Sequence, residues 1–127
     1  SPNEAERETV GYSKAWMHHK GRNRHHYEYW TDYNPQTKLM SGVKMPARYF
    51  VEMVCDRIAA SKIYLGDKYT DASPRAYYET HKDENQFHPE TRWILVYALD
   101  CLANYGEKET FRRLIEWKKQ TEKNLKK

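Results

Sequence analysis

Prolines and glycines divide the later two-thirds of the chain into segments with the length and apolar spacing of helices. Pro46, Pro74 and Pro89 each stand where a helix can begin, because the first turn tolerates a missing backbone N–H. Gly66 and Gly106 stand where a helix can end. These breaks predict helices over 46–64, 74–82, 89–105 and 107–124, with a loop over 67–73.

The amino-terminal third carries weaker signals. Acidic residues at positions 4, 6 and 8 suit the start of a helix dipole and Gly21 suits its end, which predicts a helix over 4–19 and a short turn after Asn23. Residues 31–43 have no sustained apolar period and contain turn-forming pairs, so we expect a loop. With no strand pattern found, the predicted fold is all-α. It is one compact domain over residues 1–127, a bundle of about five helices.

Aromatic side chains must supply much of the core, since the chain holds 11 Tyr, 4 Trp and 3 Phe. The helix over 46–64 is apolar on most sides, and we expect it to be the central buried helix. In the last two helices, the spacing selects a set of inward-facing residues, which are Ile94, Tyr97, Ala98, Cys101, Leu102, Tyr105, Phe111, Leu114, Ile115 and Trp117.

Composition and charge restrict the classes of function. No apolar stretch approaches the roughly 20 residues that cross a bilayer. Cys55 and Cys101 lie far apart within apolar helical patterns, as expected of buried thiols in a reducing compartment, so we expect a cytoplasmic protein. The net charge of +4 is concentrated in a basic terminal helix over 112–127. Because the rest of the chain is close to neutral, nucleic-acid binding through that helix is disfavoured.

Four of the six histidines lie between His18 and His26, on either side of Gly21. Neutral imidazole binds zinc, iron, nickel or manganese near pH 7. On one continuous helix, His19 and His26 would stand about 10 Å apart, too far to share an ion, whereas a turn at Gly21 would bring the histidine pairs together. His25 and His26 would point about 100° apart on a helix, so that one would bind the ion while the other supports it or binds substrate.

Asp56 offers a carboxylate from the predicted central helix. It shares a stripe with Tyr49, Met53, Ala60 and Ile63. An ionised carboxylate on an apolar face needs a cation, a metal or good donors. Either an arginine at position 22, 24, 48 or 92 neutralises it, or it completes a metal site with the histidines. The histidines, in turn, either bind metal or form hydrogen bonds with Tyr and Glu side chains.

The segment around the histidines has a specific pattern of residue types and spacing. It reads Ala15-Trp16-x-x-His19-x-x-x-Asn23-x-His25-His26-x-Glu28-Tyr29-Trp30, followed by Met45-Pro46 and Glu52-Met53-Val54-Cys55-Asp56. This pattern resembles a family of small bacterial and phage proteins known only as a domain of unknown function. That family is in turn similar to the HD-domain metal-dependent phosphohydrolases, which are helical proteins.

The resemblance implies an HD-domain-like fold that holds one or two metals. His19 and either His25 or His26 would match the intermediate histidines of the HD pattern, and Asp56 would match its final aspartate. The first histidine and the His-Asp dyad of that pattern have no counterpart before His18. Either the chain is the C-terminal part of a longer protein, or the ion is held incompletely.

Three functions remain open from the sequence. The first is hydrolysis of a phosphoester or nucleotide with a divalent ion (Zn, Mn, Fe, Ni or Mg). The second is a non-catalytic metal-binding or protein-interaction module. The third is single-stranded nucleic-acid binding, with Tyr27, Tyr29 and Trp30 stacking on bases. For the hydrolase, the metal ligands would be His19, His25, His26 and Asp56. The phosphate-binding residues would be Lys20, Arg22 and Arg24. Glu28 would orient an imidazole or act as a base.

Overall fold

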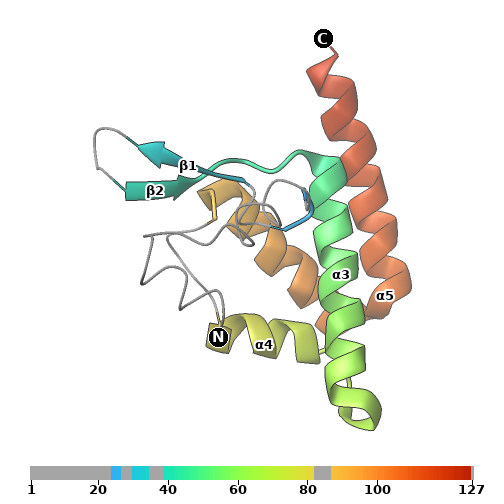
Figure 1. Ribbon diagram of the computed structural model, residues 1–127. Coiled ribbons are helices and arrows are strands. Elements are labelled where there is room, and N and C mark those ends of the chain that lie inside the picture. The colour runs from blue at the N-terminus through green and yellow to red at the C-terminus, as the bar shows by residue number, and fades with distance from the viewer. Residues whose placement is uncertain (1–23, 27–29, 35–38, 82–86, 127) are drawn as a thin grey trace, which may run out of the picture.

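Figure 1 shows a computed structural model of the chain, which describes residues 24–26, 30–34, 39–81 and 87–126. The elements are strands β1 (Thr31–Asn34) and β2 (Leu39–Gly42), helix α3 (Ala47–Leu65), the short 3-10 helix η2 (Gly66–Lys68), and helices α4 (Ser73–His81) and α5 (Pro89–Leu125). The prediction of a mostly helical protein is confirmed. The described residues contain three α-helices rather than the five predicted. The helix predicted over 4–19 lies outside the described residues.

The boundaries of the helices follow the predicted breaks closely. α3 begins directly after Pro46, whose carbonyl accepts a helical N–H at 3.0 Å, and it ends before Gly66. Gly66 has a φ of 55°, which glycine adopts without the clash of a side chain. α5 begins at Pro89, and the imidazole of His88 caps it by accepting the N–H of the second helical residue at 3.1 Å. Local chemistry therefore sets these helix ends.

Gly106 bends α5 into two arms, residues 89–105 and 107–125. Its backbone has φ 87° and ψ 177°, a region that is essentially reserved for glycine. The hydroxyl of Thr110 donates to the Gly106 carbonyl at 2.8 Å, which satisfies an acceptor next to the interrupted helix. In Figure 1 the first arm (orange) and the second arm (red) diverge from this bend. The two helices predicted on either side of Gly106 are these two arms.

Residues 31–34 and 39–42 form an antiparallel ribbon of two strands within the region where we predicted a loop. Thr31 pairs with Gly42, and the N–H of Val43 donates to the Trp30 carbonyl at 2.6 Å, just beyond the strand pair. The loop prediction is wrong because a ribbon is held by backbone pairing between two segments, which needs no apolar period within either one. The ribbon extends away from the helices (Figure 1).

The core lies between α3 and the two arms of α5. Phe50 and Val54 of α3 pack with Leu95, Leu99 and Leu102 of α5, and all five are at most 1% exposed. In Figure 1, α3 runs beside the second arm of α5, and α4 lies across the end of these helices. The inward-facing residues predicted for α5 that are indeed buried are Ala98, Cys101, Leu102 and Leu114.

The inward face predicted for α5 is wrong at three aromatic or aliphatic positions. Tyr97, Tyr105 and Ile115 are exposed by 44%, 61% and 43%. The buried face runs instead through Leu95 and Leu99. A buried tyrosine needs a hydrogen-bond partner for its hydroxyl group, whereas a leucine needs none. The exposed tyrosines leave aromatic surface on the outside of the first arm.

α3 is buried along one face rather than on most sides. Its buried residues are Ala47, Phe50, Met53, Val54 and Ile58. Cys55 is exposed, which contradicts the prediction of a buried thiol, whereas Cys101 is buried as predicted, and both thiols are free. The opposite face of α3 is therefore available for the segment that precedes the ribbon.

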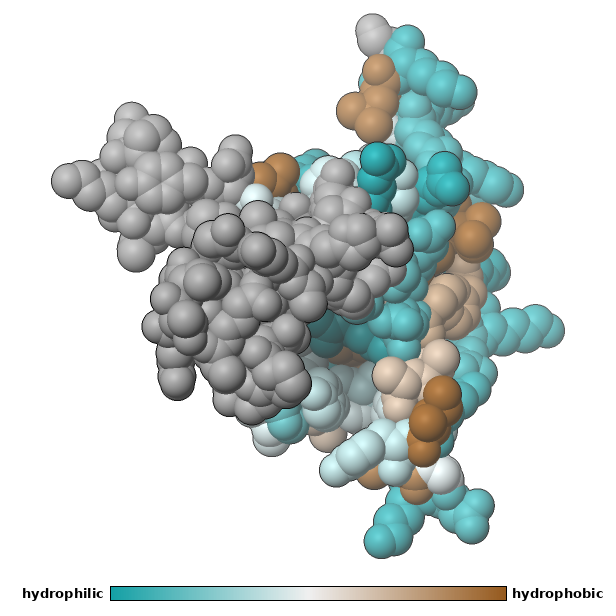
Figure 2. Space-filling model, viewed as in Figure 1, coloured by the Kyte–Doolittle hydropathy of each residue, from teal (hydrophilic) through white to brown (hydrophobic). Residues whose placement is uncertain are grey.

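The predicted basic terminal helix is the second arm of α5. Its outer side is coloured mostly hydrophilic in Figure 2. Several of its cations form ion pairs within the helix: Arg112 and Arg113 with Glu109, and Lys118 with Glu122. In the part of the chain that the structure describes, no helix is both long and apolar enough to pass through a membrane.

Candidate metal centre

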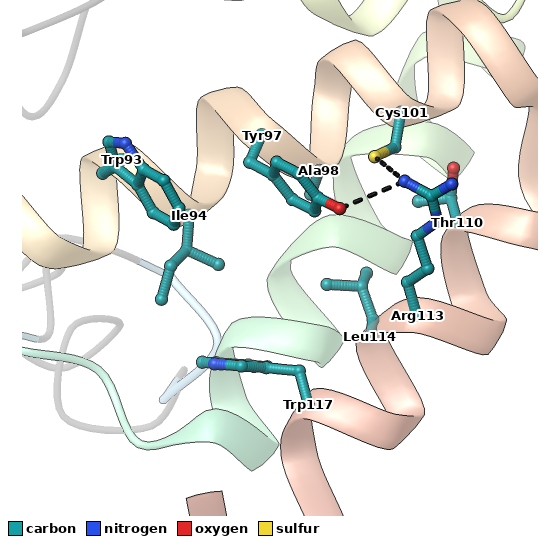
Figure 3. A pocket seen from close by; sticks show the side chains of 9 residues that line it. All are labelled: Trp93, Ile94, Tyr97, Ala98, Cys101, Thr110, Arg113, Leu114 and Trp117. Atoms are coloured by element: carbon teal, nitrogen blue, oxygen red, sulfur yellow. Dashed lines mark hydrogen bonds between the residues drawn. The ribbon is translucent and has the colours of Figure 1, made fainter. Parts of the chain in front are cut away.

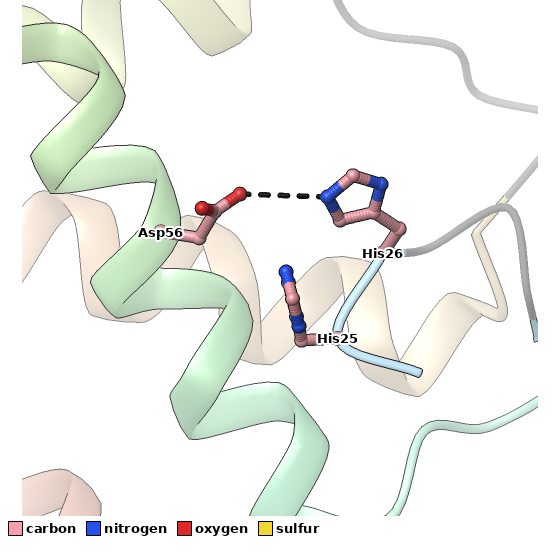
Figure 4. Close-up of side chains that lie close together, drawn as sticks. All are labelled: His25, His26 and Asp56. Carbon is pink, nitrogen blue, oxygen red and sulfur yellow. Dashed lines mark ion pairs between the residues drawn. The ribbon is translucent and has the colours of Figure 1, made fainter. Parts of the chain in front are cut away.

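Two neighbouring histidines and one aspartate converge on the open face of α3. The ligand atoms of His25, His26 and Asp56 all lie within 4.8 Å of one another. Figure 4 shows both imidazoles directed toward the carboxylate, with Nε2 of His26 at 3.6 Å from Oδ2 of Asp56. Side chains from before the ribbon and from the middle of α3 therefore meet, as predicted for the metal site.

Asp56 reaches this position because it points away from the core. It follows the fully buried Val54 by two residues, which places it about 200° around the helix at 3.6 residues per turn. Its side chain is 53% exposed. The prediction that Asp56 lies on a buried apolar face is wrong, since Ile63 on the same stripe is 85% exposed and Ala60 is also exposed.

Aromatic contacts hold the histidine segment against α3. The indole N–H of Trp30 donates to the Arg24 carbonyl at 2.6 Å, which joins Trp30 to the start of the turn. The Trp30 ring lies 5.6 Å from the ring of Tyr49, and the Arg24 guanidinium donates to the Tyr49 hydroxyl at 3.3 Å. The spacing of seven residues, two helical turns, predicted that Tyr49 shares a face with Asp56, but its contacts with Trp30 and Arg24 were not predicted.

The two imidazoles lie side by side in a turn rather than on a helix. Their ring centroids are 4.7 Å apart and their planes are nearly perpendicular, at 83°. In a helix, consecutive side chains point about 100° apart, an arrangement in which one ring would bind the ion while the other supports it or binds substrate. The turn brings both rings to the same carboxylate, and both histidines are half-buried.

Two of the arginines that we considered as partners of Asp56, Arg24 and Arg48, contact other residues. Arg48 pairs with Glu52 at 3.6 Å, and Arg24 contacts Tyr49. His26 is the ion-pair partner that the described part of the chain gives to Asp56. The remaining predicted site residues lie outside the described residues and stay predictions: His19, Lys20, Arg22 and Glu28.

His88, the sixth histidine, has a structural position. Its Nδ1 atom accepts the backbone N–H of Glu90, and it therefore caps α5 just before Pro89. Glu90 also accepts a hydrogen bond from Lys44, and this contact lowers the pKa of the Glu90 carboxyl below its usual value.

Comparison with known proteins gives one match. A family model described as a family of unknown function, DUF5662, matches residues 1–101. The matched range contains the histidine cluster and α3, and it ends within the first arm of α5. No curated protein and no solved structure matches the chain.

Proposed function

This chain belongs to DUF5662, a family of unknown function, and we propose that it is a metal-dependent phosphoester hydrolase whose ion is held by His25, His26 and Asp56. The observation that carries the proposal is the convergence of two imidazoles and a carboxylate from separate parts of the chain. Zinc, iron, nickel and manganese accept this mixed set of nitrogen and oxygen donors. Magnesium prefers oxygen donors and is the weaker candidate.

The spacing of the donors supports a shared ion. Two ligand atoms that each lie about 2.1 Å from one ion, at a tetrahedral angle, are about 3.4 Å apart. Nε2 of His26 and Oδ2 of Asp56 are separated by 3.6 Å. A charge-assisted hydrogen bond is shorter, at about 2.7–2.9 Å, so this pair has the spacing of two ligands rather than of a direct hydrogen bond. The wider separations, up to 4.8 Å, require a small rotation of the side chains.

Three protein ligands leave coordination positions for water and substrate, as in catalytic rather than structural zinc sites. The side chains of His26 and Asp56 are 32% and 53% exposed, so a small substrate has access. A bound divalent ion lowers the pKa of water and polarises a phosphoryl oxygen. HD-type phosphohydrolases, which the sequence resembles, also combine histidines with a final aspartate.

Arg24 supports a phosphorylated substrate. It directly precedes His25 in the turn and is exposed, and its guanidinium lies at the hydroxyl of Tyr49. Guanidinium groups bind phosphate oxygens through paired N–H donors, which gives both charge and orientation. Arg24 is thus the described member of the phosphate-binding set that the sequence predicts with Lys20 and Arg22.

The test measures metal binding and activity on the same protein, purified without a histidine tag. Removing a group that only supports a ligand commonly costs about 10- to 100-fold in metal affinity, so we expect His26→Ala and Asp56→Asn to cost at least that much by calorimetry. Glu52→Gln is the matched control, because Glu52 lies one turn before Asp56 and outside the cluster. The metal affinity of Glu52→Gln should equal that of the unmodified chain.

Activity decides the hydrolase part of the proposal. We expect hydrolysis of at least one member of a panel of nucleotides and simple phosphoesters, loss of that hydrolysis with chelator, and its recovery with added zinc or manganese. Bound metal without hydrolysis across the panel would contradict the enzyme. Absence of binding, or equal binding by Asp56→Asn, would contradict the site itself.

A second candidate is a non-catalytic metal-binding module. It is favoured by the position of the cluster, which joins the turn at 24–26 to α3, two segments that are separated in the sequence by the ribbon. An ion there would fix the turn to the helix, as structural metals do in small domains. Chelation would then lower stability with no activity to lose.

A further inference from the structure

A second candidate site lies between the two arms of α5. It is a pocket of about 270 Å³, shown in Figure 3, that shares no residue with the histidine cluster. Because the arms diverge from the bend at Gly106, side chains at helical spacing on each arm face a common space. The residues that matter here are Trp93, Ile94 and Tyr97 on the first arm and Arg113, Leu114 and Trp117 on the second.

The walls of the pocket are apolar and aromatic. Ile94 and Leu114 line its middle, and the indole of Trp117 lies at one end (Figure 3). Trp93 is 70% exposed, and its ring stacks on that of Tyr97 with planes 10° apart. An exposed indole beside an apolar pocket is a large unburied surface of the kind that ligands cover. Flat aromatic walls favour a flat aromatic ligand.

Charge in the pocket comes from a single side chain. Arg113 is the charged member of the lining, and no carboxylate lines the pocket in the described residues. Its Nη1 atom donates to the Tyr97 hydroxyl at 3.1 Å and to Sγ of Cys101 at 3.4 Å (Figure 3). These contacts hold the guanidinium at the end of the pocket near the bend, so the cation is already in position when a ligand arrives.

The carboxylate that contacts Arg113 is shared with a second cation. Glu109 accepts a hydrogen bond from Nε of Arg113 at 3.0 Å and also from Nε of Arg112 at 3.0 Å. One carboxylate therefore serves two guanidinium groups, while Glu116 acts electrostatically on Arg112. An anionic group on the ligand would complement the charge of Arg113, which shares its carboxylate partner.

We propose that this pocket binds a small planar aromatic compound that carries one negative charge, such as an aromatic carboxylate. The ring packs against Trp117 and the Trp93–Tyr97 pair, and the carboxylate lies toward Arg113. The volume of about 270 Å³ is near the lower end of the range for small-molecule pockets, which suits a ligand of two fused rings rather than a nucleotide or a peptide.

The test uses 2-naphthoate and its positively charged counterpart, 2-naphthylmethylamine, with ¹⁵N-labelled protein. The chain has 4 Trp, so its indole N–H groups give few signals, which Trp→Phe variants assign. We expect naphthoate to shift the Trp93 and Trp117 signals and to leave that of Trp30, which lies at the other site. The amine should bind at least about tenfold more weakly than naphthoate, since it loses a charged contact. No shift at Trp93 and Trp117 with millimolar naphthoate, or equal binding of both compounds, would overturn the proposal.

Matched variants assign the charge to one arginine. Arg113→Gln should weaken naphthoate binding by about tenfold or more, whereas Arg112→Gln, which removes the same charge from the same carboxylate but lies outside the lining, should not. An equal loss in both variants would contradict a specific role for Arg113. If Arg113→Gln does not fold, Trp93→Ala at the exposed rim replaces it, with the Trp117 signal as readout. Unchanged affinity in Trp93→Ala would contradict the proposed ring contacts.

Discussion

Glu109 accepts hydrogen bonds from Arg112 and Arg113, and these contacts lower its pKa from 4.5 to about 2. The folded pKa lies below the unfolded value, so the carboxylate contributes stability above pH 4.5 and loses that contribution as the pH falls toward about 2. We therefore expect Glu109→Gln to be less stable than the unmodified chain at pH 6, with the difference disappearing near pH 2. Thermal unfolding of both proteins across this range measures it.

Glu116→Gln serves as the control for this comparison. In the described residues the Glu116 side chain accepts from the amide of Gln120 and from no arginine. Its removal should leave the acid-induced loss of stability almost unchanged. A constant difference between Glu109→Gln and the unmodified chain from pH 6 to pH 2 would show that the arginine contacts do not act through the charge of Glu109.

The sequence identified Asp56 as a site residue, but for a reason that the structure does not bear out. Periodicity shows which residues of a helix share a face, and α3 has apolar residues around much of its circumference. It does not show which face meets the core. The face that meets the core is the one with Phe50 and Val54, because these residues pack against leucines of α5 that are distant in the sequence. Asp56 therefore lies on the outer face.

At the scale of elements, predictable features are those that depend on local chemistry. Pro89 and Gly106 act on their own backbone, and the helix start and the bend occur at the residues that the sequence indicated. The ribbon depends on pairing between Thr31–Asn34 and Leu39–Gly42, and its register comes from contacts between two strands. Neither strand has the alternation of apolar and polar residues that would have indicated a strand.

The bend at Gly106 predicts the effect of a single substitution. A β-carbon at this position would lie 3.6 Å from Oδ2 of Asp71, so there is room for it, but φ 87° with ψ 177° is unfavourable for any side chain. We expect Gly106→Ala to lower the free energy of unfolding by about 1–3 kcal/mol. Denaturant unfolding measures the change. Asn104→Ala, at an exposed helical position two residues earlier, should change stability by no more than about 0.5 kcal/mol.

A result in which Gly106→Ala is as stable as Asn104→Ala would mean that α5 runs straight at low cost. The two arms would then not be fixed at their angle. Because the pocket exists only where the arms diverge, the same variant should also lose affinity for naphthoate. The bend and the pocket are in this sense one feature of α5.

For the whole molecule, the histidine cluster is one of the contacts that connect the amino-terminal part of the described chain to the helical core. Trp30 and Tyr49 already hold the turn at 24–26 on α3. The sequence supplied the ligand types, since imidazole and carboxylate are recognisable chemistry. Their convergence could not be derived from it, because it depends on how a turn, a ribbon and a helix are arranged in space.

An ion at this cluster should stabilise the entire fold. Zinc at 100 times its dissociation constant raises the free energy of unfolding by about 2.7 kcal/mol if it binds the folded chain alone. For a protein of this size, that corresponds to a rise of roughly 5–20 °C in melting temperature. Calorimetry of chelator-treated protein, with and without zinc, measures the shift, and His26→Ala should remove most of it. His81→Ala, an exposed histidine on α4, should retain it.

A zinc-induced shift that persists in His26→Ala would place the ion elsewhere, on other histidines or on the free thiol of Cys55. A shift that disappears in His26→Ala supports the cluster as the binding site in both the catalytic and the non-catalytic proposals. These two then differ in what a substrate does. A hydrolase of phosphate monoesters releases inorganic phosphate, which remains a ligand for the ion. Inorganic phosphate should therefore raise the melting temperature further in the zinc-loaded protein, whereas a purely structural site, with its coordination completed by the protein, should show no such response.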